Sequence, residues 1–216
     1  TISDGVLDVY NLRVGRNGTG IFNQTGGSVN VRTNAMLDAN SAAGTGVVNV
    51  SDGTVKVGTY LRLEDVANGT GVFNQPGGSG EVGDDLDLAV SNGGVATYNM
   101  DGGSLIVGAN MDVQNAGATG VYNQTAGTAR FGGNLDLDVG TVIVNLSGGL
   151  LDVAGNLTPG AGTYNQTGGV ADFGGTVSLN NILTFEQSAG LLEAEYMIIG
   201  DGTPFTFTPT GGSPPV

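Results

Sequence analysis

The chain has 216 residues, of which 41 are Gly, 20 are Asp or Glu, 6 are Lys or Arg, and none is Cys or His. A net charge of −14 and scattered basic residues leave no surface that could neutralise phosphates, so we expect no nucleic-acid binding. Without Cys there are no disulfides and no thiol chemistry, and no apolar run approaches the ~20 residues that membrane insertion as a helix requires.

One phrase recurs along the whole chain. GIFNQTGGSVNV at 20–31 returns as VVNVSDGTVKV at 47–57, GVFNQPGGSGEV at 71–82, TYNMDGGSLIV at 97–107, GVYNQTAGTARF at 120–131, IVNLSGGLLDV at 143–153, GTYNQTGGVADF at 162–173, TFEQSAGLLEA at 184–194 and TFTPTGGSPPV at 206–216. The residue before the Asn, which we call the marker, stands at 22, 48, 73, 98, 122, 144, 164, 185 and 207, so successive copies lie 20–26 residues apart. A fixed period of this size is the signature of a repeat architecture.

Each unit contains three strand-like pieces in the same order. A marker strand such as 72–75 is followed by a second strand after the glycines, such as 29–31, and by a third strand of the form Leu-x-Leu, such as 61–63. All three alternate apolar and polar residues with period two. A leucine-rich repeat would need a helical piece, and a β-sandwich would not need the same residue types at fixed offsets.

The sequence therefore predicts an all-β fold, a single parallel β-solenoid (β-helix) with three sides and about nine rungs of 20–26 residues. Residues 1–216 are expected to form one continuous domain with partial rungs at both ends. The marker and the residue two positions later change together, as in Phe22/Gln24 against Val48/Val50. This pairing indicates that both face the interior of the coil.

A glycine stands five residues after every marker, where the chain must turn a corner. We expect a positive φ there, which only Gly adopts without steric cost. The corner glycines are Gly27, Gly53, Gly78, Gly103, Gly127, Gly149, Gly169, Gly190 and Gly212.

An Asn follows the marker in seven copies: Asn23, Asn49, Asn74, Asn99, Asn123, Asn145 and Asn165. Stacked amides favour a structural ladder of hydrogen bonds that satisfies backbone groups at the corners, although the same row could bind a ligand. Eight Asn-x-Ser/Thr triplets also occur, and those at the loop positions Asn17 and Asn68 would be the most reachable for glycosylation.

The third strand carries most of the candidate chemistry. Its outward column is predicted to contain Arg13, Asp38, Arg62, Asp87, Asp112, Asp136, Thr158 and Ser178. The first four alternate in sign and favour a structural ladder of opposite charges, whereas the three consecutive aspartates repel one another. A calcium ion bound by this run, with Asp84 and Asp85 nearby, is the alternative; no other cofactor is expected.

Catalytic signatures are missing from the sequence. Residues 1–216 contain no P-loop, no G-x-S-x-G motif, no zinc spacing and no EF-hand, and the carboxylates lack the basic partners used by β-helices that cleave acidic polysaccharides. We therefore expect a protein that is not an enzyme. A polysaccharide-active enzyme is the catalytic hypothesis that a screen would have to exclude.

The units GIFNQTGG, GVFNQPGG, GVYNQTAG and GTYNQTGG, each followed by alternating Val and Leu-x-Leu, resemble the repeats of bacterial surface proteins in the autotransporter-associated β-strand and PEP-CTERM repeat group. This resemblance spans essentially the whole chain. It implies an extracellular or cell-surface β-solenoid that brings no known catalytic residues. The expected function is structural, with an adhesin or glycan-binding stalk using exposed Asn, Gln and Tyr as the alternative.

The repeat is cut at both ends of the chain. Residues 6–9 match a second strand without a preceding marker strand, and residues 207–216 begin a rung without a third strand. Open strand edges present unpaired N–H and C=O groups that favour association. The sequence therefore predicts end-to-end self-association into a filament, through contacts that do not close on themselves. The alternative is a longer solenoid in which neighbouring repeats cover these edges.

Overall fold

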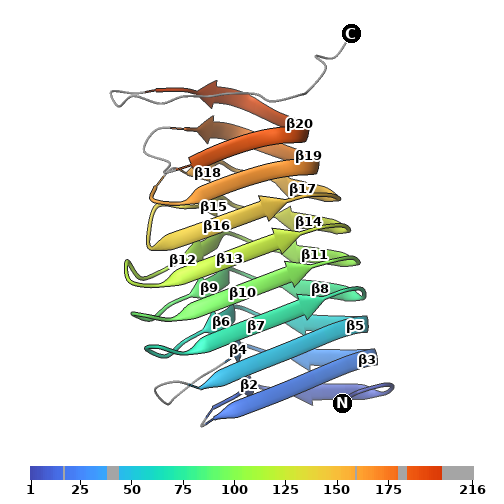
Figure 1. Cartoon of the computed structure of the whole chain (residues 1–216). Coiled ribbons are helices and arrows are strands. Elements are labelled where there is room, and N and C mark those ends of the chain that lie inside the picture. Colours follow the sequence, from blue (N-terminus) through green and yellow to red (C-terminus); the bar gives the residue numbers. More distant parts are fainter. Residues whose placement is uncertain (17, 38–43, 159, 180–183, 201–216) are drawn as a thin grey trace.

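The computed structural model describes residues 1–16, 18–37, 44–158, 160–179 and 184–200 (Figure 1). These residues form one parallel 20-stranded sheet, wound into a β-solenoid that contains no helix in any described range. The predicted fold class is thus confirmed. Eight marker strands delimit about seven complete turns, and the ninth copy of the repeat, with Gly212, lies outside the described residues. Nine rungs was therefore an approximate figure.

The marker strands stack into the first wall of the coil, on the near side in Figure 1. They are the N-terminal parts of the long strands β3 (Thr19–Val31), β5 (Thr45–Val57), β19 (Thr163–Ser178) and β20 (Thr184–Ile198), together with β7 (Thr70–Gln75), β10 (Val95–Met100), β13 (Thr119–Gln124) and β16 (Thr141–Leu146). Four of these strands thus continue around the first corner into the second wall.

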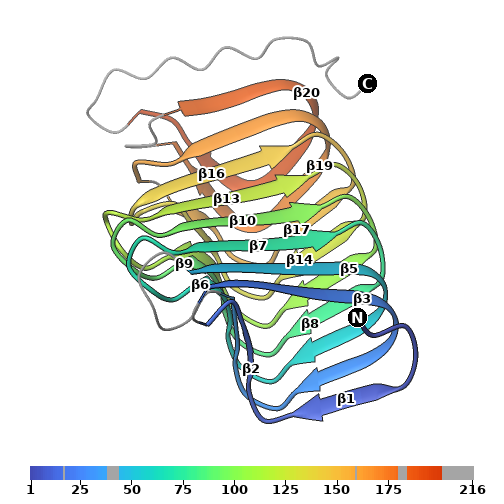
Figure 2. The ribbon, with the colours of Figure 1, turned by 60° about the horizontal axis from the view of Figure 1, so that its bottom comes forward.

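The other two walls are built in the same way, and Figure 2 shows all three running along the coil. The second wall contains β1 (Val6–Val9), β8 (Ser79–Val82), β11 (Ser104–Val107), β14 (Thr128–Phe131), β17 (Leu150–Val153) and the second halves of the long strands. The third wall contains β2 (Leu12–Val14), β4 (Ala35–Leu37), β6 (Leu61–Glu64), β9 (Leu86–Ala89), β12 (Met111–Val113), β15 (Leu135–Asp136), β18 (Leu157–Thr158) and the last parts of β19 and β20.

The parallel register places equivalent repeat positions directly above one another. The markers Phe73, Tyr98 and Tyr122 are register partners, and their rings stack inside the coil with centroids 4.8 Å and 5.8 Å apart. Tyr98 and Tyr122 are fully buried. Stacked aromatic pairs contribute ~0.5–1.5 kcal/mol each beyond the apolar area that they bury. Stacked aromatic markers therefore support the register of these turns through core packing.

Glutamine two residues after the marker faces the same core and ties neighbouring turns together. Gln24, Gln75, Gln124 and Gln166 are all fully buried. The amide nitrogen of each donates to the corner glycine of its own turn and to a second-wall carbonyl of the next turn, as in the 2.8 Å bond from Gln124 to Leu150.

The turns between these glutamines have an apolar residue at the same position. Val50, Met100 and Leu146 occupy it and are buried. From Gln24 to Gln166, glutamine and an apolar residue alternate strictly along the column. Because one glutamine reaches two successive turns, the intervening turn needs no amide of its own. From Gln24 to Gln166 the glutamine hydrogen bonds therefore repeat every two turns, and the alternation ends where Gln187 follows Gln166 in the adjacent turn.

The corner glycines lie where the first wall meets the second. All eight that fall within the described residues, from Gly27 to Gly190, have positive φ between 66° and 86°. At Gly127 (φ 80°) a Cβ atom would lie 2.6 Å from the carbonyl oxygen of Gly103, the corner of the turn below. Gly is therefore required there both by backbone conformation and by the close approach of successive corners.

Candidate functional site

The three outer faces of the solenoid differ in charge. The outward positions of the marker strands from β3 to β19, which we call the marker face, carry only Thr, Val, Ile and Asn. The protein has 26 charged residues, as 20 acidic and 6 basic, and none occupies this face until Glu186 in β20. The marker face therefore differs from the second face, whose outward positions carry charges such as Lys56 and Glu81.

The Asn column runs the length of the marker face as a continuous hydrogen-bonded ladder. Each amide nitrogen donates to the side-chain oxygen of the Asn one turn nearer the N-terminus, with N–O distances of 2.7–2.9 Å from Asn23 to Asn165. The predicted structural ladder is present, but its amides bond one another and not the corner backbone. Corner carbonyls such as that of Gly127 accept from a buried glutamine and from a backbone N–H of the next turn. From Asn49 to Asn165, every amide nitrogen in the ladder donates towards the N-terminal end of the rod.

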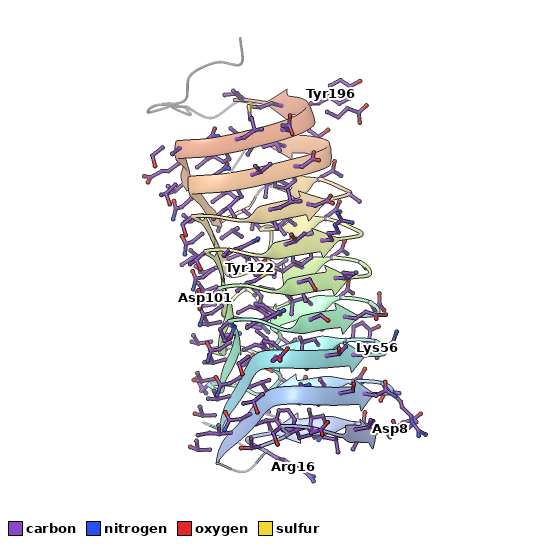
Figure 3. All side chains as sticks on the ribbon, turned by 90° about the vertical axis from the view of Figure 1, so that its right-hand side faces the viewer. Asp8, Arg16, Lys56, Asp101, Tyr122 and Tyr196 are labelled. Atoms are coloured by element: carbon purple, nitrogen blue, oxygen red, sulfur yellow. The ribbon has the colours of Figure 1, made fainter. Side chains whose placement is uncertain are left out.

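A groove of about 500 Å³ follows the ladder across four turns. One wall consists of Asn74, Asn99, Asn123 and Asn145, and the opposite wall consists of Pro76, Asp101, Thr125 and Ser147, with Gln124 also contributing. The Thr125 hydroxyl donates to the Asp101 carboxylate at 2.8 Å, and this bond holds two side chains of the groove wall opposite the Asn ladder. Figure 3 shows Asp101 at this margin of the coil and Tyr122 in the interior.

The aromatic and glutamine columns do not reach the marker face. Tyr98, Tyr122 and Tyr164 are fully buried, as is Gln124. Of the Asn, Gln and Tyr columns that were expected on one exposed face, only the Asn column faces outward. Side-chain alternation explains the difference, since the marker and the residue two positions on share one face, and the Asn between them points to the other.

The second face carries isolated pairs of opposite charge between neighbouring turns. Lys56 pairs with Glu81, and the guanidinium of Arg32 lies 2.7 Å from the carboxylate of Asp8. Asp8 and Lys56 are labelled at the surface in Figure 3. The side chains of these pairs are 40–61% exposed, so each contributes only ~0–1 kcal/mol to stability. Towards the C-terminal end the same face becomes acidic, because Asp152, Asp172 and Glu193 are register partners in successive turns.

The third face differs from its predicted column. Register pairs Arg13 with Met36 and Met36 with Arg62, so Asp38 does not belong to the column and lies outside the described residues. The alternation of charge among the first four members was therefore wrong. The inward residue of β4 is the small Ala35, which pairs with Leu12 and Leu61. The strand thus begins two residues earlier than a Leu-x-Leu pattern starting at Leu37 would place it.

The prediction that Asp87 faces water was also wrong. Its carboxylate is fully buried, accepting a 2.7 Å bond from the Arg62 Nε and another of 2.7 Å from the Gln114 amide. Arg62 also lies 3.5 Å from Asp65 and packs over the Tyr60 ring. Burial raises the pKa of Asp87 in spite of Arg62.

Asp112 lies directly over Asp87 in the register of the third wall, with Asp136 following in the next turn. Burial, followed by the negative charge of Asp87, raises the pKa of Asp112 from 3.8 to about 8. Asp112 and Asp87 share a hydrogen bond, so at neutral pH the proton stays on Asp112 and the charge stays on Asp87 beside Arg62. Burial also raises the pKa of Asp136. One proton thus relieves the predicted repulsion between the first two aspartates.

Two polar features of the third wall were missed at the sequence level. Glu64 is fully buried, and its carboxylate accepts backbone N–H bonds from Val66, Val90 and Ser91 at 2.6–3.1 Å. Desolvation outweighs these bonds and raises the pKa of Glu64.

The other missed feature is a second ladder, in which each side-chain oxygen accepts the backbone N–H of the equivalent residue in the next turn. It joins Asp85, Asn110, Asn134, Asn156 and Thr176, with N–O distances of 2.7–2.9 Å. The recurrent Asp or Asn immediately before the third strand was the available signal.

No group of three or more Asp, Glu, His or Cys side chains within the described ranges is arranged to hold a metal ion. Asn68 lies in an exposed loop with φ 62°, whereas Asn17 is outside the described residues. Among the residues with described structure, no helix has the length and apolarity needed to cross a membrane.

Comparisons with protein families, curated proteins and solved structures find no match to the chain.

Proposed function

We propose that the protein is an extracellular structural element, a β-solenoid rod that joins end to end to build a fibre, filament or surface layer. The observation that carries this proposal is the exact repetition of one contact between turns: the same backbone pairs, core columns and Asn bonds recur from β3 to β19. Such a contact can be repeated between two copies as readily as within one. The resemblance to bacterial surface repeats supports the extracellular location.

The outermost described turn shows what an added turn would cover. Met197 in β20 is the register partner of Val177, which is fully buried, yet Met197 itself is 39% exposed. Ile199 is 47% exposed at the same end. Burying apolar surface contributes ~25 cal/mol per Å², so stacking a further turn over these side chains would favour association.

The test is the length distribution of particles in negative-stain micrographs over a range of protein concentrations. The wild-type chain should form filaments that lengthen with concentration. Met197→Asp, which places a charge in the inward column, should leave short rods. Tyr196→Asp is the matched control, because Tyr196 is 63% exposed on the neighbouring position, and it should leave the filaments intact. Isolated short rods from the wild-type chain at every concentration would contradict the proposal.

A further inference from the structure

The Asn ladder has hydrogen-bonding capacity that the fold does not use. A carboxamide has two N–H donors and two acceptor lone pairs on its oxygen. The Asn123 amide nitrogen donates one hydrogen bond to Asn99, and its side-chain oxygen accepts one from Asn145, each at 2.8 Å. One donor and one acceptor therefore remain on every interior amide of the ladder. Because these side chains are only half-buried, the remaining sites form a regular row along the groove.

We propose that this groove binds an extended, neutral glycan chain running parallel to the axis of the rod, with one sugar residue over each turn. The turns repeat at the strand spacing of ~4.8 Å, close to the rise of one residue in an extended glycan. Sugar hydroxyls both donate and accept hydrogen bonds, which matches one free donor and one free acceptor per turn. The Thr125 and Ser147 hydroxyls on the opposite wall offer the second side of the chain similar partners.

Charge and spacing select this ligand over others. Asp101 is the single charged residue lining the groove, so an anionic glycan would be repelled by it and by the net charge of −14. An extended peptide presents side chains to one face every ~6.6–6.8 Å, which falls out of step with the ladder within two turns.

Binding is independent of end-to-end assembly and is tested on the folded chain by isothermal titration calorimetry. The probes are cellohexaose, chitohexaose and mannohexaose, with hexagalacturonate as the anionic comparison. At least one neutral hexasaccharide should bind, and hexagalacturonate should not. Absence of binding by all three neutral probes would overturn the proposal, and so would preferential binding of hexagalacturonate.

Two matched pairs of variants locate the site. Asn123→Ala and Asn49→Ala each remove an amide bonded on both sides within the ladder, but only Asn123 lines the groove. Asn123→Ala should weaken binding about tenfold, the effect of losing about one hydrogen bond, and Asn49→Ala should leave it unchanged. Thr125→Arg should block the groove while its control, Thr167→Arg at the equivalent corner outside it, should not.

Circular dichroism confirms that each variant is folded, and light scattering shows whether copies associate side by side. Equal losses of affinity in the two Asn variants would mean that binding depends only on ladder integrity and would refute the proposed site. A wild-type chain whose lateral dimers are abolished by Thr125→Arg would show that a second copy, and not a glycan, occupies this face.

Discussion

Replacing Asp112 by Asn should stabilise the solenoid at neutral pH. In the folded chain the pKa of Asp112 is raised from 3.8 to about 8, so it holds a proton at pH 7 that the unfolded chain has released. Protonating this carboxyl at pH 7, ~3 units above its ordinary pKa, costs at most ~4 kcal/mol at ~1.36 kcal/mol per unit. Partial exposure of the side chain to water lowers this, and we expect a gain of ~2 kcal/mol for Asp112→Asn.

The direction of the pH dependence follows from the raised pKa. Below pH ~3.8 both the folded and the unfolded chain hold the proton, so the carboxyl and the Asn amide should be nearly equivalent. As the pH rises from about 4 towards 8, the folded chain binds more protons than the unfolded one, and the wild-type free energy of unfolding falls. Asp112→Asn should lack this part of the slope, and its amide can still donate to Asp87.

Urea unfolding followed by far-ultraviolet circular dichroism at pH 4, 6 and 8 measures the effect. The difference between Asp112→Asn and wild type should grow with pH. Asp172→Asn, an exposed aspartate in β19, is the control and should change stability by less than ~0.5 kcal/mol at each pH. A variant at pH 8 no more stable than wild type would refute the proton assignment to Asp112.

Three further substitutions test the internal supports of the coil by the same urea assay. Gly127→Ala should cost more than ~2 kcal/mol of stability, because a Cβ atom there meets the Gly103 carbonyl. The control Gly5→Ala has an equally positive φ but open space around the new Cβ, and should cost only ~1 kcal/mol. Similar losses in the two variants would contradict the contact. Gln124→Leu should cost ~1–3 kcal/mol by removing the two hydrogen bonds from its amide to Gly127 and Leu150, and no loss would show that the glutamine column is dispensable. Glu64→Ala should cost a similar amount and increase proteolysis of the loop at 65–69, while unchanged digestion would refute an anchoring role for this carboxylate.

The fold was predictable because each of its main features recurs. A marker, an Asn and a corner Gly at constant offsets are enough to place strands and turns, and period-two alternation is enough to send Phe73 and Gln75 inward and Asn74 outward. The marker face could also have been found in the sequence, since its outward positions carry no charge over seven strands.

Features that depend on a single turn were not predictable. The third strand of one turn starts at Ala35, whose small side chain breaks the Leu-x-Leu pattern, and this moved Asp38 wrongly into the column. Burial of Asp87 depends on Arg62 and Gln114 reaching it from the turns on either side. Such contacts arise from side-chain reach across turns, which periodicity does not encode.

The two-turn unit set by the buried glutamines limits how such a chain can change its length. Loss of a single turn between β3 and β19 would place two glutamines or two apolar residues in adjacent layers, an arrangement that otherwise begins only where Gln187 follows Gln166. Loss or gain of two adjacent turns restores the alternation. Between Gln24 and Gln166, turns added or removed in pairs should therefore preserve the core layers of this coil better than single turns.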